Sequence, residues 1–242
     1  MARFFVTPEE LEMDQLTLTG ENAQHAKVLR LKVGEEVLLC DGDGREALCK
    51  IASVGSFTDV EILERRESAS EAAVKVSVYM AFPKADKLEH VIQKATELGA
   101  YEIVAFPSSR CVSKPDEKSL QKKLERWQKI AASAAEQSGR GCVPRVRVLK
   151  SYQEALQDGA QTDLPILFYE NERATTLRMA LEEQPFRSVS LLTGPEGGLE
   201  EKEVEQAKNA GFKICTLGSR ILRCETAPLC ALSAVMYAAG EF

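Results

Sequence analysis

From about residue 73 to the end, short apolar segments alternate with longer amphipathic ones, and this alternation is the strongest constraint that the sequence places on the fold. The apolar segments have the length of buried strands: AVKVSVYMAF, YEIVAF, RVRVL, PILFYE, SVSLLT and KICTLG. The segments between them carry apolar residues at helical spacing; DKLEHVIQKATELGA, for example, has a one-sided apolar face and a closing Gly99. A last helix is expected from about Thr226 to Ala239. Such alternation predicts an α/β domain built on a parallel sheet.

The first 70 residues have the pattern of a small β domain. EEVLLCDGDGREALCKIASVG predicts two strands joined by a turn at Asp41–Gly44, and FTDVEILER predicts another strand. A short helix is expected over Glu21–Leu31. The segment RRESASEAA, residues 65–73, is rich in small and charged residues and marks a linker. We therefore expect a β-barrel-like module in residues 1–70 and the α/β domain in residues 71–242.

Charge and cysteine content narrow the class of protein. The net charge of −6 argues against an indiscriminate nucleic-acid binder, yet Arg110–Lys150 holds 11 basic and 4 acidic residues, against 8 basic and 14 acidic ones in residues 1–70. Seven cysteines occur without any C-x-x-C pair and the two histidines are far apart, so we expect reduced thiols and no metal site. No signal-peptide pattern or bilayer-spanning apolar run is present, so we expect a cytoplasmic protein with no membrane partner.

The segment LLTGPEGGLEEKEV, from Leu191 to Val204, places a glycine-rich turn directly after a predicted strand. Ligands of parallel α/β sheets bind beyond the carboxyl ends of the strands, so this turn is a candidate site, as are FYENER and LGSRILRCETA. Neither G-x-G-x-x-G nor G-x-x-x-x-G-K-[ST] occurs, and the nearby glutamates disfavour a phosphate. A neutral or cationic ligand therefore suits the turn better. Of those glutamates, Glu200, Glu201 and Glu203 are expected to do no more than favour the start of a helix.

The loop LGSRILRCETA carries Arg220, Arg223 and Glu225 between an apolar strand and an apolar helix. The arginines suit contact with nucleic-acid phosphate or the orientation of a base. For Glu225 the residues leave three roles open: accepting a proton, capping the following helix, or pairing with an arginine.

At this point the sequence closely resembles a known family. LLTGPEGGLEEKEV and LGSRILRCETAPLCALSAVMYA resemble the signatures of RsmE-type 16S rRNA uracil-N3 methyltransferases of the SPOUT superfamily. HAKVLRLKVGEEVLLCDGDG, DKLEHVIQKATELGA and RWQKIAASAAEQSGRGCVPRV match the same family in order and spacing, so the resemblance covers nearly the whole chain and is weakest over Lys150–Arg187. It implies an N-terminal PUA-like RNA-binding β-barrel, a C-terminal SPOUT methyltransferase domain with a deep trefoil knot, and a homodimer.

The resemblance also implies S-adenosyl-L-methionine as the cofactor, bound between three loops. A sulfonium donor that carries no phosphate agrees with the acidic surroundings of the glycine-rich turn. The family usually has proline in place of Ser219 and often threonine in place of Cys224. The residues expected to bind the cofactor are Phe168, Tyr169, Thr193, Gly194, Pro195, Glu196, Gly197, Gly198, Leu217, Gly218, Ser219, Ile221 and Leu222.

The implied reaction is methylation of N3 of a uridine in 16S rRNA, at the position conventionally numbered 1498. Arg223 is expected to stabilise charge on a uracil oxygen and Glu225 to act as the base. Because the N-terminal module is acidic, we expect recognition of the assembled small ribosomal subunit, with the basic stretch Arg110–Lys150 contacting phosphates. The residues expected to contact RNA are Arg3, Arg30, Gln137, Arg140 and Arg220.

The residues alone leave two other functions open. A non-catalytic RNA-binding or ribosome-assembly protein would be identified by normal N3-methyluridine in the rRNA of a deletion strain. A nucleotide-binding enzyme would be identified by measurable ATP affinity. Binding of S-adenosylhomocysteine that Gly197→Arg abolishes would instead identify the methyltransferase.

Overall fold

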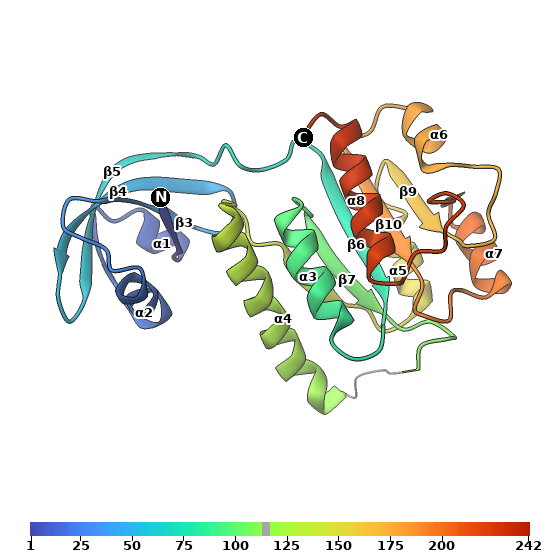
Figure 1. The fold of residues 1–242 in the computed structure, drawn as a ribbon, viewed down its shortest axis with the longest axis horizontal. Helices are drawn as coiled ribbons and strands as arrows, with labels where there is room; N and C mark the ends of the chain where they lie inside the picture. Colours follow the sequence, from blue (N-terminus) through green and yellow to red (C-terminus); the bar gives the residue numbers. More distant parts are fainter. Residues whose placement is uncertain (113–116) are drawn as a thin grey trace. The chain divides into compact units, whose positions relative to one another are not determined.

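The computed structural model describes residues 1–112 and 117–242 and divides into two compact units (Figure 1). The N-terminal unit comprises Met1–Glu71 and Ala135–Val143, and the C-terminal unit comprises Ala72–Ala134 and Pro144–Phe242. The chain therefore leaves the N-terminal unit and returns to it once. Each unit has its own sheet and its own hydrophobic core.

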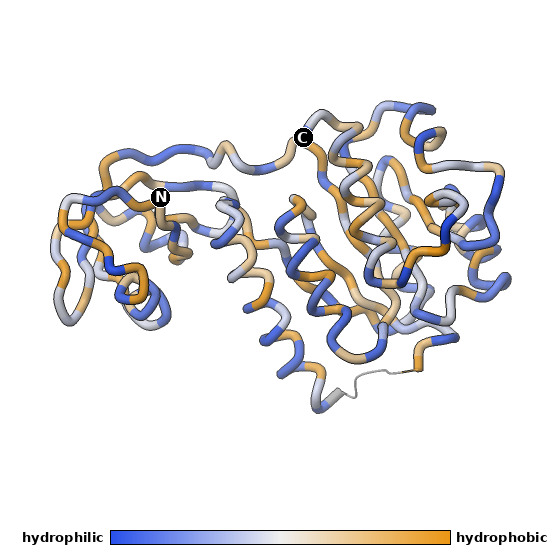
Figure 2. The backbone as a smooth tube through the Cα atoms, viewed as in Figure 1, coloured by the Kyte–Doolittle hydropathy of each residue, from blue (hydrophilic) through white to orange (hydrophobic). Residues whose placement is uncertain are grey.

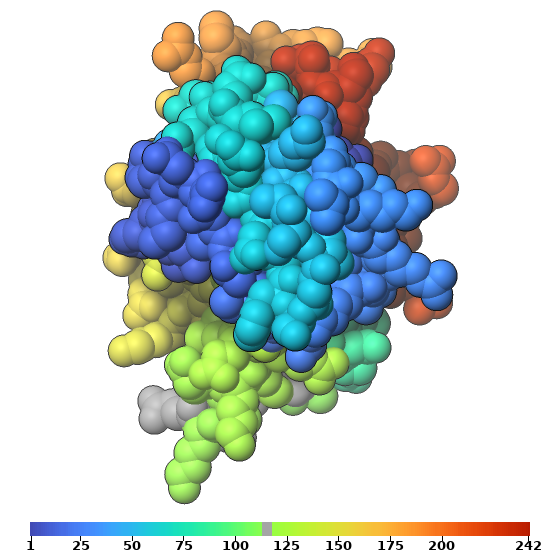
Figure 3. Space-filling model, turned by 90° about the vertical axis from the view of Figure 1, so that its left-hand side faces the viewer, coloured from blue at the N-terminus to red at the C-terminus, as the bar shows by residue number. Residues whose placement is uncertain are grey.

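The N-terminal unit is built on a five-stranded sheet with the order β1-β3-β4-β5-β2. Its elements are β1 (Ala2–Phe5), α1 (Pro8–Leu11), β2 (Gln15–Leu18), α2 (Gly20–Val28), β3 (Glu36–Cys40), β4 (Arg45–Val54) and β5 (Thr58–Glu67). Strand β1 runs parallel to β3, whereas the other pairs are antiparallel. The core includes Phe4, Leu39, Ala47 and Val60. In the view of Figure 3, the blue to cyan atoms of this unit lie next to one another without a break.

The predicted hairpin in this unit is confirmed as β3 and β4. Its turn is held by one side chain: the Asp41 carboxylate accepts hydrogen bonds from the Asp43 amide (2.9 Å), the Arg45 amide (3.1 Å) and the Arg45 Nε (2.7 Å). An aspartate that bonds to the backbone a few residues ahead is typical of tight turns. The predicted helix and third strand are present as α2 and β5, whereas the sequence patterns missed β1, β2 and α1. Each of these has four residues, too few to show a period.

The C-terminal unit confirms the predicted parallel α/β fold. All pairs in its six-stranded sheet are parallel, in the order β11-β9-β10-β6-β7-β8. Its strands are β6 (Lys75–Ala81), β7 (Glu102–Phe106), β8 (Arg145–Val148), β9 (Leu164–Phe168), β10 (Ser188–Thr193) and β11 (Lys213–Cys215). Its helices are α3 (Lys87–Glu97), α4 (Glu117–Ser138, whose last residues belong to the N-terminal unit), α5 (Tyr152–Gly159), α6 (Leu177–Glu182), α7 (Glu201–Asn209) and α8 (Thr226–Ala238).

The strands of this sheet are mainly hydrophobic, whereas its helices other than α8 carry both hydrophobic and hydrophilic residues along their length (Figure 2). This difference follows from burial, because helices cover a parallel sheet on both faces and leave its strands no solvent-facing side. Within the described residues, no helix is long and apolar enough to cross a membrane.

The strand order decides where the loops of the C-terminal unit meet. Strand β10 lies between β9 and β6, and β11 lies beside β9, so the strands are not ordered as they occur in the chain. In the register of the sheet, Leu167 of β9 is level with Leu192 of β10 and with Ile214 of β11. The three strands therefore end at the same edge of the sheet, and the loops that follow them are neighbours.

Candidate functional site

A cavity of about 470 Å³ lies in the C-terminal unit where β9, β10 and β11 end. It is lined by parts of the three loops that the sequence singled out. The predicted residues among its lining are Phe168, Tyr169, Thr193, Gly194, Pro195, Glu196, Gly197, Gly198, Leu217, Gly218, Arg220, Ile221, Leu222 and Arg223. Ser219 and Glu225 belong to the same loop but are not among the lining residues. The cavity is also lined by Glu170, Arg173, Leu199, Cys224 and Ala227, which lie in the predicted loops but were not named individually, and by Lys87 and Thr216, which lie outside those loops.

The glycine-rich turn is compact and packs closely against a neighbouring loop. The Gly198 amide donates to the Pro195 carbonyl at 2.9 Å, and Gly198 has a φ of +68°. A Cβ atom at Gly198 would lie 2.3 Å from Oε1 of Glu170, and one at Gly194 would lie 3.0 Å from Cγ of Leu199. The left-handed φ favours glycine at position 198, and the close approach of Leu199 favours it at position 194, whatever the cavity binds.

The loop after β11 is held to the loop after β9. The Thr216 amide donates to the Thr175 carbonyl at 2.9 Å, and its hydroxyl exchanges hydrogen bonds with the backbone of Gly218, where φ is +106°. Beyond this anchored part the loop is open: Ile221 is 81% exposed although it lines the cavity, and Arg223 is exposed as well. An apolar side chain and an arginine therefore stand at the mouth of the cavity.

A lysine that the sequence patterns did not select connects two of the loops. Nζ of Lys87, the first residue of α3, lies 3.0 Å from Oε1 of Glu196 in the glycine-rich turn and 3.2 Å from Oε2 of Glu225 in the loop before α8. Glu225 occupies the N-cap position of α8, but its carboxylate makes no capping hydrogen bond within the described chain. Of the roles that the sequence left open for Glu225, the structure shows an ion pair, and its partner is Lys87 instead of an arginine.

This arrangement sets the charges of the site. Burial acts to raise the pKa of Glu196, but hydrogen bonds from the Lys84 amide and from Lys87 outweigh it and lower that pKa. Burial also acts to raise the pKa of Glu225. Hydrogen bonds from its own amide, from Cys224 and from Lys87 outweigh burial and lower that pKa below its usual value. Burial, together with the hydrogen bond to Glu225, raises the pKa of the Cys224 thiol to about 12. At neutral pH the group formed by Lys87, Glu196, Cys224 and Glu225 therefore consists of one ammonium group, two ionised carboxylates and a neutral thiol.

The glutamates after the turn start α7, as predicted, and Glu203 does more. Glu200 is the N-cap residue of α7, and Glu201 and Glu203 lie in its first turn. The carboxylate of Glu203, which is 4% exposed, accepts hydrogen bonds from the amides of Glu200 and Ser109, both at 2.9 Å. Glu203 therefore caps α7 and also joins it to the segment that follows β7.

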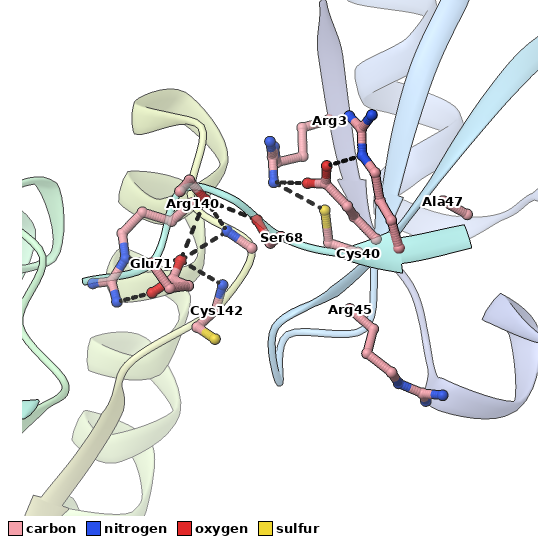
Figure 4. A network of polar contacts seen from close by, with 12 residues as sticks. Arg3, Cys40, Arg45, Ala47, Ser68, Glu71, Arg140 and Cys142 are labelled. Carbon is pink, nitrogen blue, oxygen red and sulfur yellow. Dashed lines mark hydrogen bonds and ion pairs between the residues drawn. The ribbon is translucent and has the colours of Figure 1, made fainter. Parts of the chain in front are cut away.

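Four of the residues predicted to contact RNA belong to the N-terminal unit, and two of them are already paired there (Figure 4). Nη1 of Arg3 lies 3.1 Å from Oε2 of Glu46, and Nη2 of Arg140 lies 2.6 Å from Oε2 of Glu71. Arg3 and Arg140 expose only 10% and 7% of their side chains. By contrast Arg30, Gln137 and the cavity residue Arg220 are exposed. All five remain predictions as RNA contacts.

All seven cysteines are free thiols. In the part of the chain that the structure describes, no group of three or more histidine, cysteine, aspartate or glutamate side chains is placed to hold a metal ion.

Comparison with known proteins places both units in one family. Residues 70–236 match the model of an RNA methyltransferase domain, and residues 18–62 match that of an RNA methyltransferase PUA domain. Ribosomal RNA small subunit methyltransferase E of Bacillus subtilis is 39% identical over 98% of this chain and 96% of its own length. The corresponding protein of Mesomycoplasma hyopneumoniae is 33% identical over 96% of this chain and 98% of its own.

A solved structure agrees with these matches. The crystal structure of ribosomal RNA small subunit methyltransferase E from Neisseria gonorrhoeae bound to S-adenosyl methionine superposes with a TM-score of 0.88 and 34% identity, covering 98% of this chain and 97% of that one. The resemblance found in the sequence is confirmed: this chain belongs to the RsmE family of RNA methyltransferases, with a PUA domain followed by an RNA methyltransferase domain.

Proposed function

We propose that this chain transfers a methyl group from S-adenosyl-L-methionine to N3 of a uridine in 16S rRNA, at the position conventionally numbered 1498, within the assembled small ribosomal subunit. The observation that carries the proposal is the cavity. Its walls come from three loops that are distant in the chain, and they contain most of the residues that the family resemblance implies for the cofactor.

The residues of the cavity fit this cofactor. A volume of about 470 Å³ is in the range of small-molecule sites. Phe168, Leu217 and Leu222 offer apolar surface to an adenine, whereas Glu170 and Glu196 suit a ligand that carries positive charge. Glu196 beside the glycine-rich turn opposes a phosphate. When bound, S-adenosyl-L-methionine supplies an electrophilic methyl group attached to a sulfonium.

The reaction requires a bond between N3 and the methyl carbon to form while the bond between sulfur and that carbon breaks, and the N3 proton must leave. We assign Arg223, exposed at the cavity mouth, to stabilise negative charge on a uracil oxygen. Glu225 is assigned to accept the proton. Because its pKa is lowered, Glu225 is a weak base, so charge stabilisation and alignment of the reacting atoms supply most of the rate enhancement.

We further propose that the exposed residues Arg30, Gln137 and Arg220 contact rRNA directly, and that Arg3 and Arg140 do so by exchanging their glutamate partners for phosphate. The basic stretch adds Lys118, Lys122, Lys123 and Lys129, all exposed on α4; the part of the stretch at residues 113–116 lies outside the described residues. Such contacts are electrostatic and independent of base sequence. They offset the acidic character of residues 1–70, which disfavours naked RNA and is the reason for proposing a folded ribosomal particle as the substrate.

Four finer features are also proposals. We infer that residues 1–70 form the RNA-binding domain, to which Ala135–Val143 also belongs by its contacts, and that the rest of residues 71–242 forms the catalytic domain. We also infer a deep trefoil knot around the cavity, which the displaced strand order, with β10 between β9 and β6, supports. We infer a homodimer, which the exposed Cys230 and Tyr237 on the otherwise apolar α8 support, and we further propose that the protein is cytoplasmic.

The decisive experiment locates the methyl group. Small subunits from a strain that lacks this protein are incubated with the purified chain and S-adenosyl-L-methionine, and the 16S rRNA is digested and analysed by mass spectrometry. We expect a single new N3-methyluridine, and less methylation of protein-free 16S rRNA. A methyl group on another base would contradict the assigned target, and equal methylation of naked rRNA would contradict the assigned particle.

A further inference from the structure

Lys87 bridges two walls of the cavity, and neither the sequence patterns nor the comparisons assign it a role. We propose that Lys87 is a positioning residue for methyl transfer: by holding Glu196 and Glu225 together, it fixes the loop that carries Arg223 against the glycine-rich turn. The inference rests on the proposed methyl transfer to rRNA but not on which base accepts the methyl group.

Lys87 contacts residues that are distant from it in the sequence. Its Nζ lies 3.0 Å from Glu196 Oε1 and 3.2 Å from Glu225 Oε2, and it lies 3.7 Å from Sγ of Cys224, which is 137 positions away in sequence. Two ionised carboxylates thus meet at one ammonium nitrogen. Without that nitrogen they would repel each other across the cavity wall, and the loops that carry them would separate.

The lysine itself is held in place. It is the first residue of α3, whose Leu88 and Val91 are buried in the core of the C-terminal unit. Three residues earlier, the Lys84 amide donates to the same Glu196 oxygen at 3.0 Å. The chain at the start of α3 therefore contacts Glu196 of the glycine-rich turn twice, once through the Lys84 amide and once through the Lys87 side chain.

On the other side, Glu225 moves with Arg223. The carbonyl of Arg223 accepts the amides of Thr226 and Ala227, both at 2.9 Å, so Arg223 belongs to the hydrogen-bonded start of α8. Glu225 lies two residues further on, at the N-cap position. Holding Glu225 therefore holds the backbone from which the Arg223 side chain extends over the cavity.

The position of this ion pair argues for a role in catalysis above a role in overall stability. Lys87 and Glu225 expose 26% and 21% of their side chains, and partly exposed ion pairs contribute little to folding. Misplacement of a reacting group by a small distance, in contrast, has a large effect on rate. Replacing Lys87 should therefore lower kcat strongly while it lowers thermal stability only slightly.

The test uses the full-length protein and small subunits from a strain that lacks it, with total labelled methyl transfer as the readout. We expect Lys87→Met to lower kcat by about tenfold or more, and to do so by a larger factor than it raises the Kd for S-adenosylhomocysteine, measured by calorimetry. Lys87→Arg retains a cation that reaches both carboxylates and should recover most of the lost kcat. Lys208→Met removes a lysine that pairs with Glu205 on the surface of α7, and it serves as the matched control.

A double-mutant cycle examines whether Lys87 acts through Glu225. If it does, Glu225→Gln combined with Lys87→Met should lose no more kcat than the more damaging single variant. Independent, multiplicative losses would overturn the proposal, as would Lys87→Arg being as inactive as Lys87→Met. A Lys87→Met variant that loses only cofactor affinity, at unchanged kcat, would overturn it too. A wild-type protein that transfers no methyl to rRNA would instead refute the proposed function, which keeps the two failures distinct.

Discussion

The carboxylate of Glu71 and the guanidinium of Arg140 form an ion pair of 2.6 Å that closes the N-terminal unit on its returning segment, Ala135–Val143 (Figure 4). The same carboxylate accepts the amides of Gly141 (2.9 Å) and Cys142 (3.0 Å). One side chain thus satisfies a buried arginine and two backbone donors. Arg140, which the sequence pattern assigned to RNA, has a structural partner in the free protein.

Replacing Glu71 tests how much this pair stabilises the unit. Glu71→Gln keeps an oxygen for the amides but removes the charge facing Arg140, so we expect the free energy of unfolding to fall by about 1–3 kcal/mol. Chemical denaturation followed by circular dichroism measures the change. Glu64→Gln, an exposed glutamate on β5, is the control and should change little. Equal stability of Glu71→Gln and wild type would show that the pair is not needed.

The same pair predicts a pH dependence. Burial acts to raise the pKa of Glu71, but the hydrogen bond and charge of Arg140, with the two amides, lower it below its usual value. A carboxyl whose pKa is lower in the folded state stabilises the fold above its unfolded pKa, and this contribution is lost as the pH falls through the folded pKa. The stability difference between wild type and Glu71→Gln should therefore be largest near neutral pH and shrink below about pH 4.5. A difference independent of pH would contradict the assignment.

Gly198 provides a test of the cavity wall. An alanine there would carry a left-handed φ, at a cost of about 1–2 kcal/mol, and its Cβ would displace the Glu170 carboxylate. We expect Gly198→Ala to lose the thermal stabilisation that S-adenosylhomocysteine gives to the wild type. Gly211→Ala is the matched control, because Gly211 has a φ of +93° with nothing within 4 Å of the added Cβ. It should lose similar intrinsic stability but keep the response to ligand.

The contributions of Glu203 and Glu201 to the stability of the protein can be measured separately. Glu203→Ala removes the acceptor for the amides of Glu200 and Ser109, and we expect it to lower the free energy of unfolding by about 1–2 kcal/mol. Glu201→Ala, an exposed first-turn position, should cost much less. Urea titration of both variants distinguishes the cap from a general effect of acidic residues near the helix start. Similar losses for the two variants would assign the effect to the helix dipole alone.

Cys224 is predicted to act as a neutral donor. Its thiol donates to Glu225 at 3.2 Å, and its pKa of about 12 leaves it protonated at any assay pH. Cys224→Ser preserves a donor, so we expect its methyltransferase activity to stay within about threefold of wild type, with the same pH profile from about pH 6 to 9. Cys224→Val removes the donor and should be less active. Loss of activity in the serine variant would indicate that sulfur itself is required.

Much of the fold followed from local patterns. The apolar segments of β6, β7, β9 and β10 were recognisable because strands buried on both faces are hydrophobic throughout. The β3–β4 hairpin was recognisable from its Asp-Gly turn. Strand order was not, because pairing partners distant in the chain leave no local period, and neither were the four-residue elements β1 and β2.

The candidate site likewise contains residues that the sequence predicted and residues that it did not. Glycines and charges placed after strands marked the loops, so most of the cavity lining was predicted by residue number. Lys87 was not, since it stands at the start of an ordinary amphipathic helix and nothing in its neighbours indicates a partner far along the chain. Arg3 and Arg140 show the converse: the family resemblance, and for Arg140 also the basic stretch around it, predicted contact with RNA, but an ion pair with Glu46 or Glu71 depends on long-range packing.

The sequence by itself therefore determined the class of fold, the family, and the loops that carry the chemistry, because each of these depends on residue type and on spacing over a short range. Only the tertiary structure decided which charges meet. It joined Glu196 and Glu225 through Lys87 and enclosed Arg140 against Glu71, because such contacts depend on the order of the strands and on the return of the chain, which no short-range pattern contains.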